Sequence, residues 1–245
     1  MKTDKAIDFE CWFIILGFLF FVIVLQPTKG ACADDIIIMT FGDSITCGYP
    51  VIPYSGWDAN GCNCGPTQKK LEDLLDQSGR ASLVLNWGHG GESTVHGLNR
   101  ITSDMNTTIS ILGKLDYVLL LEGTNDYSWG LSPATTAYNI GRMIDKIKAV
   151  GAVPLVGTLT PDTKTNGKNI PRYNSAIIST VNAKEAILVD HYSRIVHDWS
   201  SLTYDGLHPN QKGYEFMANV WFSALLSQIN GKNIVSILNL LLENE

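Results

Sequence analysis

Short apolar runs recur along the chain, separated by longer stretches with a different spacing of hydrophobic residues. The runs are Ile36–Phe41, Leu83–Trp87, Tyr117–Leu121, Val153–Leu159 and Ala186–Val189. Continuous apolar runs of this length, rich in β-branched residues, are typical of strands that are buried on both faces of a sheet. The pattern therefore predicts five buried strands.

The stretches between these runs place apolar residues three and four positions apart, which is the spacing of one helical face. Proline and serine mark helix starts, and glycine marks helix ends. Helices are predicted from Pro66 to Gly79, Leu98 to Gly113, Ser132 to Gly151 and around Ile170–Val181, with a long last helix after Asn210. Strands that alternate with helices predict an α/β fold, a three-layer αβα sandwich around a parallel sheet.

Residues 1–33 are expected to be a signal peptide and to lie outside the fold. Cys11–Leu25 is an apolar run of 15 residues, and Ala31-Cys32-Ala33 is a small-x-small cleavage pattern. The protein is then secreted or periplasmic. Because nearby acidic residues offset Lys2 and Lys5 at the start of the leader, an uncleaved membrane anchor is the alternative. The domain is expected over 34–230, and 231–245 are expected to form a short helical tail.

The net charge and the cysteines limit which partners and cofactors the sequence predicts. A net charge of −6 provides no basic footprint for nucleic acid or for an anionic membrane surface. In an oxidising compartment, Cys47 is expected to pair with Cys62 or Cys64, which leaves one free or intermolecular thiol. Cys62 and Cys64 are close enough in sequence to be metal ligands, but no companion cysteine or histidine pair has the spacing of metal ligands. No metal and no cofactor are therefore predicted. The expected partner is a small-molecule, lipid or glycan ester, with no obligatory protein partner.

Polar residues and glycines gather in four blocks of the sequence. Three follow predicted strands, and the fourth precedes the last helix. The blocks are Phe41–Thr46, Asn86–Thr94, Glu122–Asp126 and Asp205–Asn210. Because the carboxyl ends of parallel strands meet at one edge of a sheet, these blocks are predicted to form a site there.

Three side chains in these blocks suit acyl transfer. The hydroxyl of Ser44 is a candidate nucleophile, and it needs a base to take its proton. His208 fits that task because imidazole titrates near neutrality. Asp205 lies three residues before His208 and can orient the imidazole, so the sequence predicts a Ser-His-Asp triad.

The four blocks, in this order, resemble the SGNH-hydrolase superfamily of GDSL-type esterases and lipases. The resemblance implies a flavodoxin-like sheet of five parallel strands in the order 2-1-3-4-5. It also implies an oxyanion hole made by the backbone N–H groups of Ser44 and Gly91 and the side-chain amide of Asn125. On chemistry alone Gly88 and Gly90 compete with Gly91, and the family's motif selects Gly91.

The resulting hypothesis is an exported serine esterase that acts on carboxylic esters. The last block and the stretch Asn86–Arg100 resemble the lysophospholipase-like branch of this superfamily, which favours a lipase-like, lysophospholipase- or thioesterase-like enzyme. A polysaccharide O-acetylesterase is the alternative. Aromatic residues on the loops, Tyr54, Trp57, Tyr127 and Trp129, are expected to line the substrate site. A non-catalytic flavin- or carbohydrate-binding module is a more distant alternative, in which the Asp-x-x-His loop would have no purpose in binding flavin.

Overall fold

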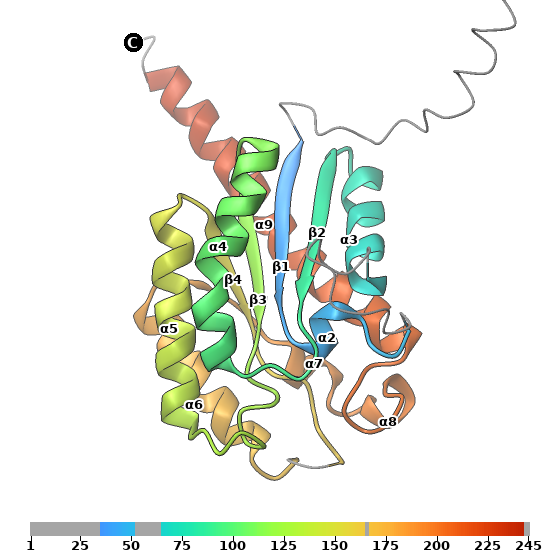
Figure 1. The fold of residues 1–245 in the computed structure, drawn as a ribbon. Helices are drawn as coiled ribbons and strands as arrows, with labels where there is room; N and C mark the ends of the chain where they lie inside the picture. Colours follow the sequence, from blue (N-terminus) through green and yellow to red (C-terminus); the bar gives the residue numbers. More distant parts are fainter. Residues whose placement is uncertain (1–34, 52–64, 165–166, 243–245) are drawn as a thin grey trace, which may run out of the picture. The chain divides into compact units, whose positions relative to one another are not determined.

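The structure is a computed structural model that describes residues 35–51, 65–164 and 167–242. Within these residues five strands form one parallel sheet in the order β2-β1-β3-β4-β5. The strands are β1 (Ile36–Gly42), β2 (Ser82–Gly88), β3 (Tyr117–Leu121), β4 (Val153–Gly157) and β5 (Ile187–Val189). The predicted three-layer fold and strand order are confirmed (Figure 1).

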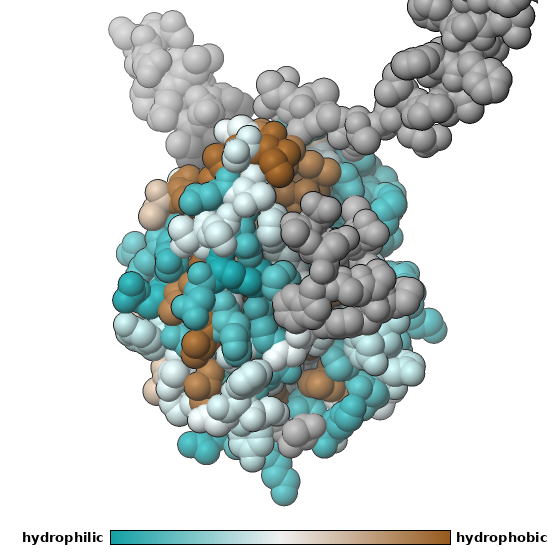
Figure 2. Space-filling view, viewed as in Figure 1, coloured by the Kyte–Doolittle hydropathy of each residue, from teal (hydrophilic) through white to brown (hydrophobic). Residues whose placement is uncertain are grey.

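Helices cover both faces of the sheet. The described helices are α2 (Ser44–Cys47), α3 (Pro66–Gln77), α4 (Thr94–Leu112), α5 (Pro133–Ala149), α6 (Ile170–Ala183), α7 (His191–Ile195), α8 (Trp199–Leu202) and α9 (Gln211–Leu242). On one face α5 packs between α4 and α6, and on the other α3 packs against α9. On the surface around α4 and α5, hydrophobic residues form separate patches among hydrophilic ones (Figure 2).

The core between the layers follows from the apolar runs. Every residue of β3 is buried, as expected for a central strand covered on both faces. Helix α3 contributes Leu71 and Leu75, and α9 contributes Tyr214, Trp221 and other apolar side chains to the same cluster. The hydrophobic burial on the two faces fixes the sheet between the helices and leaves its ends for the loops.

The register of the central strands brings three of the four blocks to one edge. Gly42 at the end of β1 is paired with Gly88 of β2 and with Leu121 of β3. Adjacent strands lie about 4.8 Å apart. The loops that begin after these three residues therefore start side by side at the carboxyl edge of the sheet.

Several boundaries differ from the sequence-based expectation. Helix α4 begins at Thr94 rather than near Leu98, because Ser93 is the residue at its N-cap and its N–H donates to His96 Nδ1 at 3.3 Å. Strand β4 ends at Gly157, two residues early. The tail after residue 230 continues α9 to Leu242 instead of forming a separate helix.

Some expectations concern residues outside the described part. The leader, Cys62 and Cys64 lie there, as do Tyr54 and Trp57. Cys47 is disulfide-bonded, and its partner also lies outside the described residues. Among the helices that the structure describes, none is both long and apolar enough to cross a membrane.

Candidate active site

Ser44 lies immediately after β1, at the start of the single-turn helix α2. Asp43 precedes it and accepts a hydrogen bond from the Ile45 N–H at 2.9 Å, which closes this turn. The Ser44 hydroxyl lies 3.0 Å from Nε2 of His208, across a sequence separation of 164 residues. The sequence predicted a serine in the block that follows the first strand, and the structure places it in a short helix with its hydroxyl next to the imidazole.

The Asp205–His208 loop between α8 and α9 is closed by its own hydrogen bonds. The backbone N–H groups of Leu207 and His208 donate to Asp205 Oδ1 at 3.0 and 2.8 Å, which is the local pattern of an aspartate-stabilised turn. The Tyr204 N–H and the Thr203 hydroxyl both donate to the His208 carbonyl at 2.8 Å. As a result both carboxylate oxygens of Asp205 lie 3.2 Å from His208 Nδ1.

The structure thus brings the three predicted side chains into one continuous row, from the Ser44 hydroxyl through the imidazole to the carboxylate. The edge of the Tyr49 ring packs against the imidazole, with the ring centroids 4.8 Å apart. Burial alone would raise the pKa of Asp205. Hydrogen bonds from the His208 N–H, the Lys164 ammonium and the Leu207 N–H outweigh this effect and hold the pKa well below its usual range. The carboxylate is therefore ionised at neutral pH, and it can orient an imidazole and stabilise its protonated form.

The predicted oxyanion donors lie on the loops next to this row. Gly91 has a φ of 77°, in the left-handed region that favours glycine, and it is exposed. Asn125 Nδ2 donates to the Glu92 carbonyl at 2.8 Å and lies 3.5 Å from Asp43 Oδ2. Within the described residues the N–H groups of Ser44 and Gly91 donate no hydrogen bond. These two groups are thus available to a ligand, and the 3.5 Å contact leaves one hydrogen of the Asn125 amide weakly bound.

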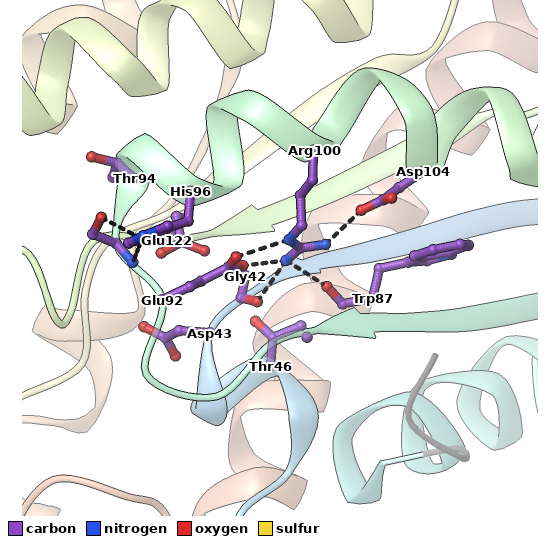
Figure 3. A network of polar contacts seen from close by, with 12 residues as sticks. Gly42, Asp43, Thr46, Trp87, Glu92, Thr94, His96, Arg100, Asp104 and Glu122 are labelled. Atoms are coloured by element: carbon purple, nitrogen blue, oxygen red, sulfur yellow. Dashed lines mark hydrogen bonds and ion pairs between the residues drawn. The ribbon is translucent and has the colours of Figure 1, made fainter. Parts of the chain in front are cut away.

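A charged network lies behind these loops (Figure 3). Arg100 of α4 bonds to Glu92, to Asp104 at 2.6 Å, and to the carbonyls of Gly42 and Trp87 at 3.2 and 3.0 Å. One guanidinium group therefore ties together the ends of β1 and β2 and the turn that follows Gly91. These contacts hold the backbone before Ser44 and the backbone around Gly91 in place.

Two further acids lie beside this network and are fully buried. Burial raises the pKa of Asp43 to about 7, although the hydrogen bond from the Ile45 N–H lowers it and the nearby Glu92 raises it. Burial, with the neighbouring charges of Glu92 and Asp43, raises the pKa of Glu122 well above its ordinary value. Raised pKa values favour the neutral forms of both acids, which reduces the negative charge beside this network.

The described aromatic residues that were expected to contact substrate have two different positions. Trp129 donates from Nε1 to the Gly91 carbonyl at 3.0 Å and packs against His96, so it braces the Gly91 turn. Tyr127 instead lines a cleft of about 600 Å³ at the same edge of the sheet. The other residues of the cleft come from the loop after β4, from α7 and from α8: Pro161, Asp162, Thr163, Lys164, Gly167, Lys168, Asn169, Tyr192, Val196 and Trp199.

Sequence reasoning missed the charged partners of the site. Lys164 reaches Asp205 from 41 residues away, and no spacing in the chain indicates that contact. A signal did exist for Arg100, because Asp104 lies four positions after it, the spacing at which opposite charges pair on a helix. Glu92 and Asp104 are acidic residues close to it along the chain.

Among the remaining histidines, His191 has an unusual environment. It is fully buried, and within the described part of the chain neither ring nitrogen has a hydrogen-bond partner. The cause is its place at the start of α7, where the imidazole packs against Trp221 rather than a polar group. Within residues 35–51, 65–164 and 167–242, no cluster of three or more histidine, cysteine or acidic side chains could hold a metal ion.

Comparison with known proteins places this site in a family. Residues 40–216 match the model of the GDSL-like Lipase/Acylhydrolase family, a span that includes Ser44, Gly91, Asn125, Asp205 and His208. No curated protein matches the chain.

Solved structures share the fold at low sequence identity. The esterase EstA from Pseudoalteromonas sp. is 19% identical with a TM-score of 0.63, covering 80% of this chain and 100% of its own. The family 3 carbohydrate esterase of Clostridium thermocellum is 24% identical with a TM-score of 0.65, covering 80% and 98%. The acetylxylan esterase Axe2 from Geobacillus stearothermophilus is 15% identical with a TM-score of 0.62, covering 80% and 96%.

These identities show a common fold, whereas the family match extends over most of the chain and contains the loops at the carboxyl edge of the sheet. The chain therefore belongs to the GDSL-like lipase/acylhydrolase family, within the SGNH-type esterases, and it is a carboxylic ester hydrolase.

Proposed function

We propose that this enzyme hydrolyses esters through an acyl-enzyme on Ser44, with His208 as general base and acid and Asp205 as the orienting carboxylate. The observation that carries the proposal is the 3.0 Å contact between the Ser44 hydroxyl and His208 Nε2, with Asp205 on the opposite side of the imidazole. A hydroxyl, an imidazole and a carboxylate in this order are the parts that acyl transfer to serine requires.

In the first half of the reaction, Ser44 Oγ attacks the carbonyl carbon of the ester while His208 Nε2 takes the hydroxyl proton. Asp205 holds the other ring nitrogen in its protonated state and stabilises the imidazolium. The N–H groups of Ser44 and Gly91 and the amide of Asn125 donate to the oxygen that becomes negative. His208 then returns the proton to the alcohol oxygen, the bond to that oxygen breaks, and the acyl group remains on Ser44.

In the second half, water replaces the alcohol. His208 takes a proton from the water as its oxygen attacks the acyl carbon, and the same donors stabilise the second tetrahedral intermediate. The bond to Ser44 Oγ breaks, the proton returns to Oγ, and the carboxylic acid leaves. The residues are then in their starting protonation states.

For the substrate, we propose a short acyl group on a polyhydroxylated alcohol such as a glycan. The cleft beside Asp205 combines the aromatic residues Tyr127, Tyr192 and Trp199 with several polar side chains. Aromatic faces with polar groups around them suit a sugar ring better than an extended acyl chain. Two of the solved structures with this fold are described as carbohydrate or acetylxylan esterases. The lipid-type ester remains the second candidate, favoured by the resemblance of the sequence blocks.

One set of assays tests both parts. p-Nitrophenyl acetate, butyrate and octanoate, together with acetylated xylan oligosaccharides, are given to the wild type, Ser44→Ala and the control Ser179→Ala on the exposed face of α6. We expect Ser44→Ala to lose about 10⁴-fold or more of kcat on every substrate, because the nucleophile is gone. Ser179→Ala should behave as wild type.

The two parts fail in different ways. Wild-type rates in Ser44→Ala would refute the acyl-enzyme mechanism. If Ser44 is required but kcat/KM is highest for octanoate and no acetate is released from the oligosaccharides, the glycan proposal is wrong and the lipid-type ester is favoured. Highest activity on acetyl esters, with acetate released, supports the glycan proposal.

A further inference from the structure

The carboxylate of Asp205 is held by donors on two different loops. Oδ1 accepts from two backbone N–H groups of its own loop, those of Leu207 and His208. Oδ2 accepts from the Lys164 ammonium at 2.9 Å. Among the described residues, Lys164 is the donor to Asp205 that comes from outside this loop, and it lies on the segment that follows β4.

Backbone contacts place Lys164 there independently of its side chain. The Thr163 N–H donates to the Gly206 carbonyl at 2.8 Å, and the Lys164 N–H donates to Asp162 Oδ1, also at 2.8 Å. Gly206 has a φ of 89°, and a Cβ on it would lie 2.7 Å from the Thr163 hydroxyl. The two loops are therefore joined next to Asp205, and the lysine side chain has a short distance to cover.

We propose that Lys164 is a positioning residue for the Asp205–His208 pair, an inference that rests on the proposed triad. By occupying Oδ2 it prevents the carboxylate from turning toward solvent, so both oxygens stay 3.2 Å from the imidazole. Without it, the donors left to Asp205 among the described residues are the two N–H groups on Oδ1 and His208 Nδ1 itself. Charge-assisted hydrogen bonds are shorter and stronger than neutral ones.

The positive charge of Lys164 also acts on the imidazole in a direction that can be predicted. The ammonium behind the carboxylate repels a second positive charge on the imidazole ring. The other titratable groups that face this pair or Lys164 are Tyr49, Asp162 and Tyr214. Lys164 is the cation among these groups, so its removal changes the local charge in one direction.

The test compares Lys164→Met, Lys164→Arg and Lys184→Met, with p-nitrophenyl acetate as the probe. Lys184→Met is the matched control, because Lys184 forms an ion pair of the same type with Asp145, at 2.6 Å, but at the C-terminal end of α6. That end leads into β5 and lies at the opposite edge of the sheet. Profiles of kcat, KM and kcat/KM against pH are recorded at low and at 0.5 M salt, with a thermal melt for each variant.

We expect Lys164→Met to lower kcat about three- to ten-fold with little change in KM, since one charge-assisted hydrogen bond is lost. The acid limb of its kcat/KM profile should move to higher pH by a few tenths of a unit, roughly, because the opposing charge is gone. Salt should reduce this difference in the acid limb. Lys164→Arg should keep the wild-type limb, and Lys184→Met should match wild type in all kinetic measurements.

Other results overturn the proposal. A Lys164→Met enzyme whose kcat and acid limb equal those of Lys184→Met would show that the ammonium positions nothing. A change confined to KM would make Lys164 a substrate contact instead. Neither result affects the triad, which is tested separately by Ser44→Ala.

Discussion

The side-chain amide of Asn125 connects two loops at the candidate site. Its Nδ2 donates to the Glu92 carbonyl at 2.8 Å, which fixes the peptide between Glu92 and Ser93. The same nitrogen has a second hydrogen, whose contact with Asp43 is long at 3.5 Å. In the proposed mechanism this second hydrogen is donated to the developing oxyanion, a better acceptor than the distant carboxyl group.

Asn125→Ala should therefore lower kcat about 10²–10³-fold, with a much smaller effect on KM, because the lost hydrogen bond forms mainly in the transition state. Steady-state kinetics on p-nitrophenyl acetate measure this. Asn219→Ala is a suitable control, since Asn219 donates to a backbone carbonyl at 2.7 Å on the exposed part of α9. A kcat for Asn125→Ala within about two-fold of wild type would contradict the assigned role.

At the scale of elements, Asp126 holds the loop after β3 against two helices. It is fully buried, and its carboxylate accepts from the Thr94 N–H at 2.8 Å, the Thr94 hydroxyl at 2.6 Å and the Thr136 hydroxyl at 2.5 Å. Thr94 begins α4, and Thr136 lies in the first turn of α5. One carboxylate thus joins the end of β3 to the starts of two helices, directly after Asn125.

Removing this carboxylate should destabilise the fold. Asp126→Ala leaves an N–H and two hydroxyls buried without their acceptor, and we expect the free energy of unfolding to fall by about 2–4 kcal/mol. Urea denaturation provides the measurement. Asp145→Ala breaks an exposed ion pair and should cost less than about 1 kcal/mol. Equal losses in the two variants would mean that Asp126 does not join these elements.

At the scale of the whole molecule, His191 links folding stability to pH. Burial lowers its pKa to about 3 from the ordinary 6.5, a change that the nearby Arg194 supports and Asp190 opposes. Between these two pH values the unfolded chain binds a proton that the folded chain excludes. The contribution of His191 to the free energy of unfolding therefore has its full value above pH 6.5 and decreases as the pH falls toward 3.

His191→Leu should flatten this dependence. Relative to wild type, the free energy of unfolding of the variant should gain roughly 1.4 kcal/mol for each pH unit below 6.5, because leucine has no proton to bind. Urea denaturation at pH 7, 6, 5 and 4 gives the comparison, and only the difference between the proteins is used. His197→Leu, which changes an exposed histidine, should keep the wild-type slope. A wild-type slope in His191→Leu would refute the role of burial.

The predictions from sequence were most accurate where the evidence is local. The run Tyr117–Leu121 was predicted to be a strand with those bounds, because its side chains are buried on both faces. The order of the strands came from the resemblance to a family and not from periodicity. The start of α4 was placed too late, since the predicted helix was read from its apolar face and the capping by Ser93 was overlooked.

The candidate site was predictable to the same degree. Ser44, Asp205 and His208 were chosen as candidates because a nucleophile, a base and an orienting acid are recognisable residue types in ordered blocks, and the structure brings their side chains together. The contact between Lys164 and Asp205 was not, because a lysine in a loop usually points into water. The lack of hydrogen-bond partners for the His191 ring nitrogens among the described residues was also missed, since it depends on Trp221 of a different element.

The sequence by itself determined the alternation of strands and helices, and it determined which loops carry polar residues. Both depend on which neighbouring positions must be buried, and this is written in the local order of residues. The tertiary structure alone decided that the hydroxyl of residue 44 meets the imidazole of residue 208, and that Lys164 reaches Asp205. Contacts between such distant residues depend on the packing of the elements and on the course of the loops between them, and no local pattern contains that information.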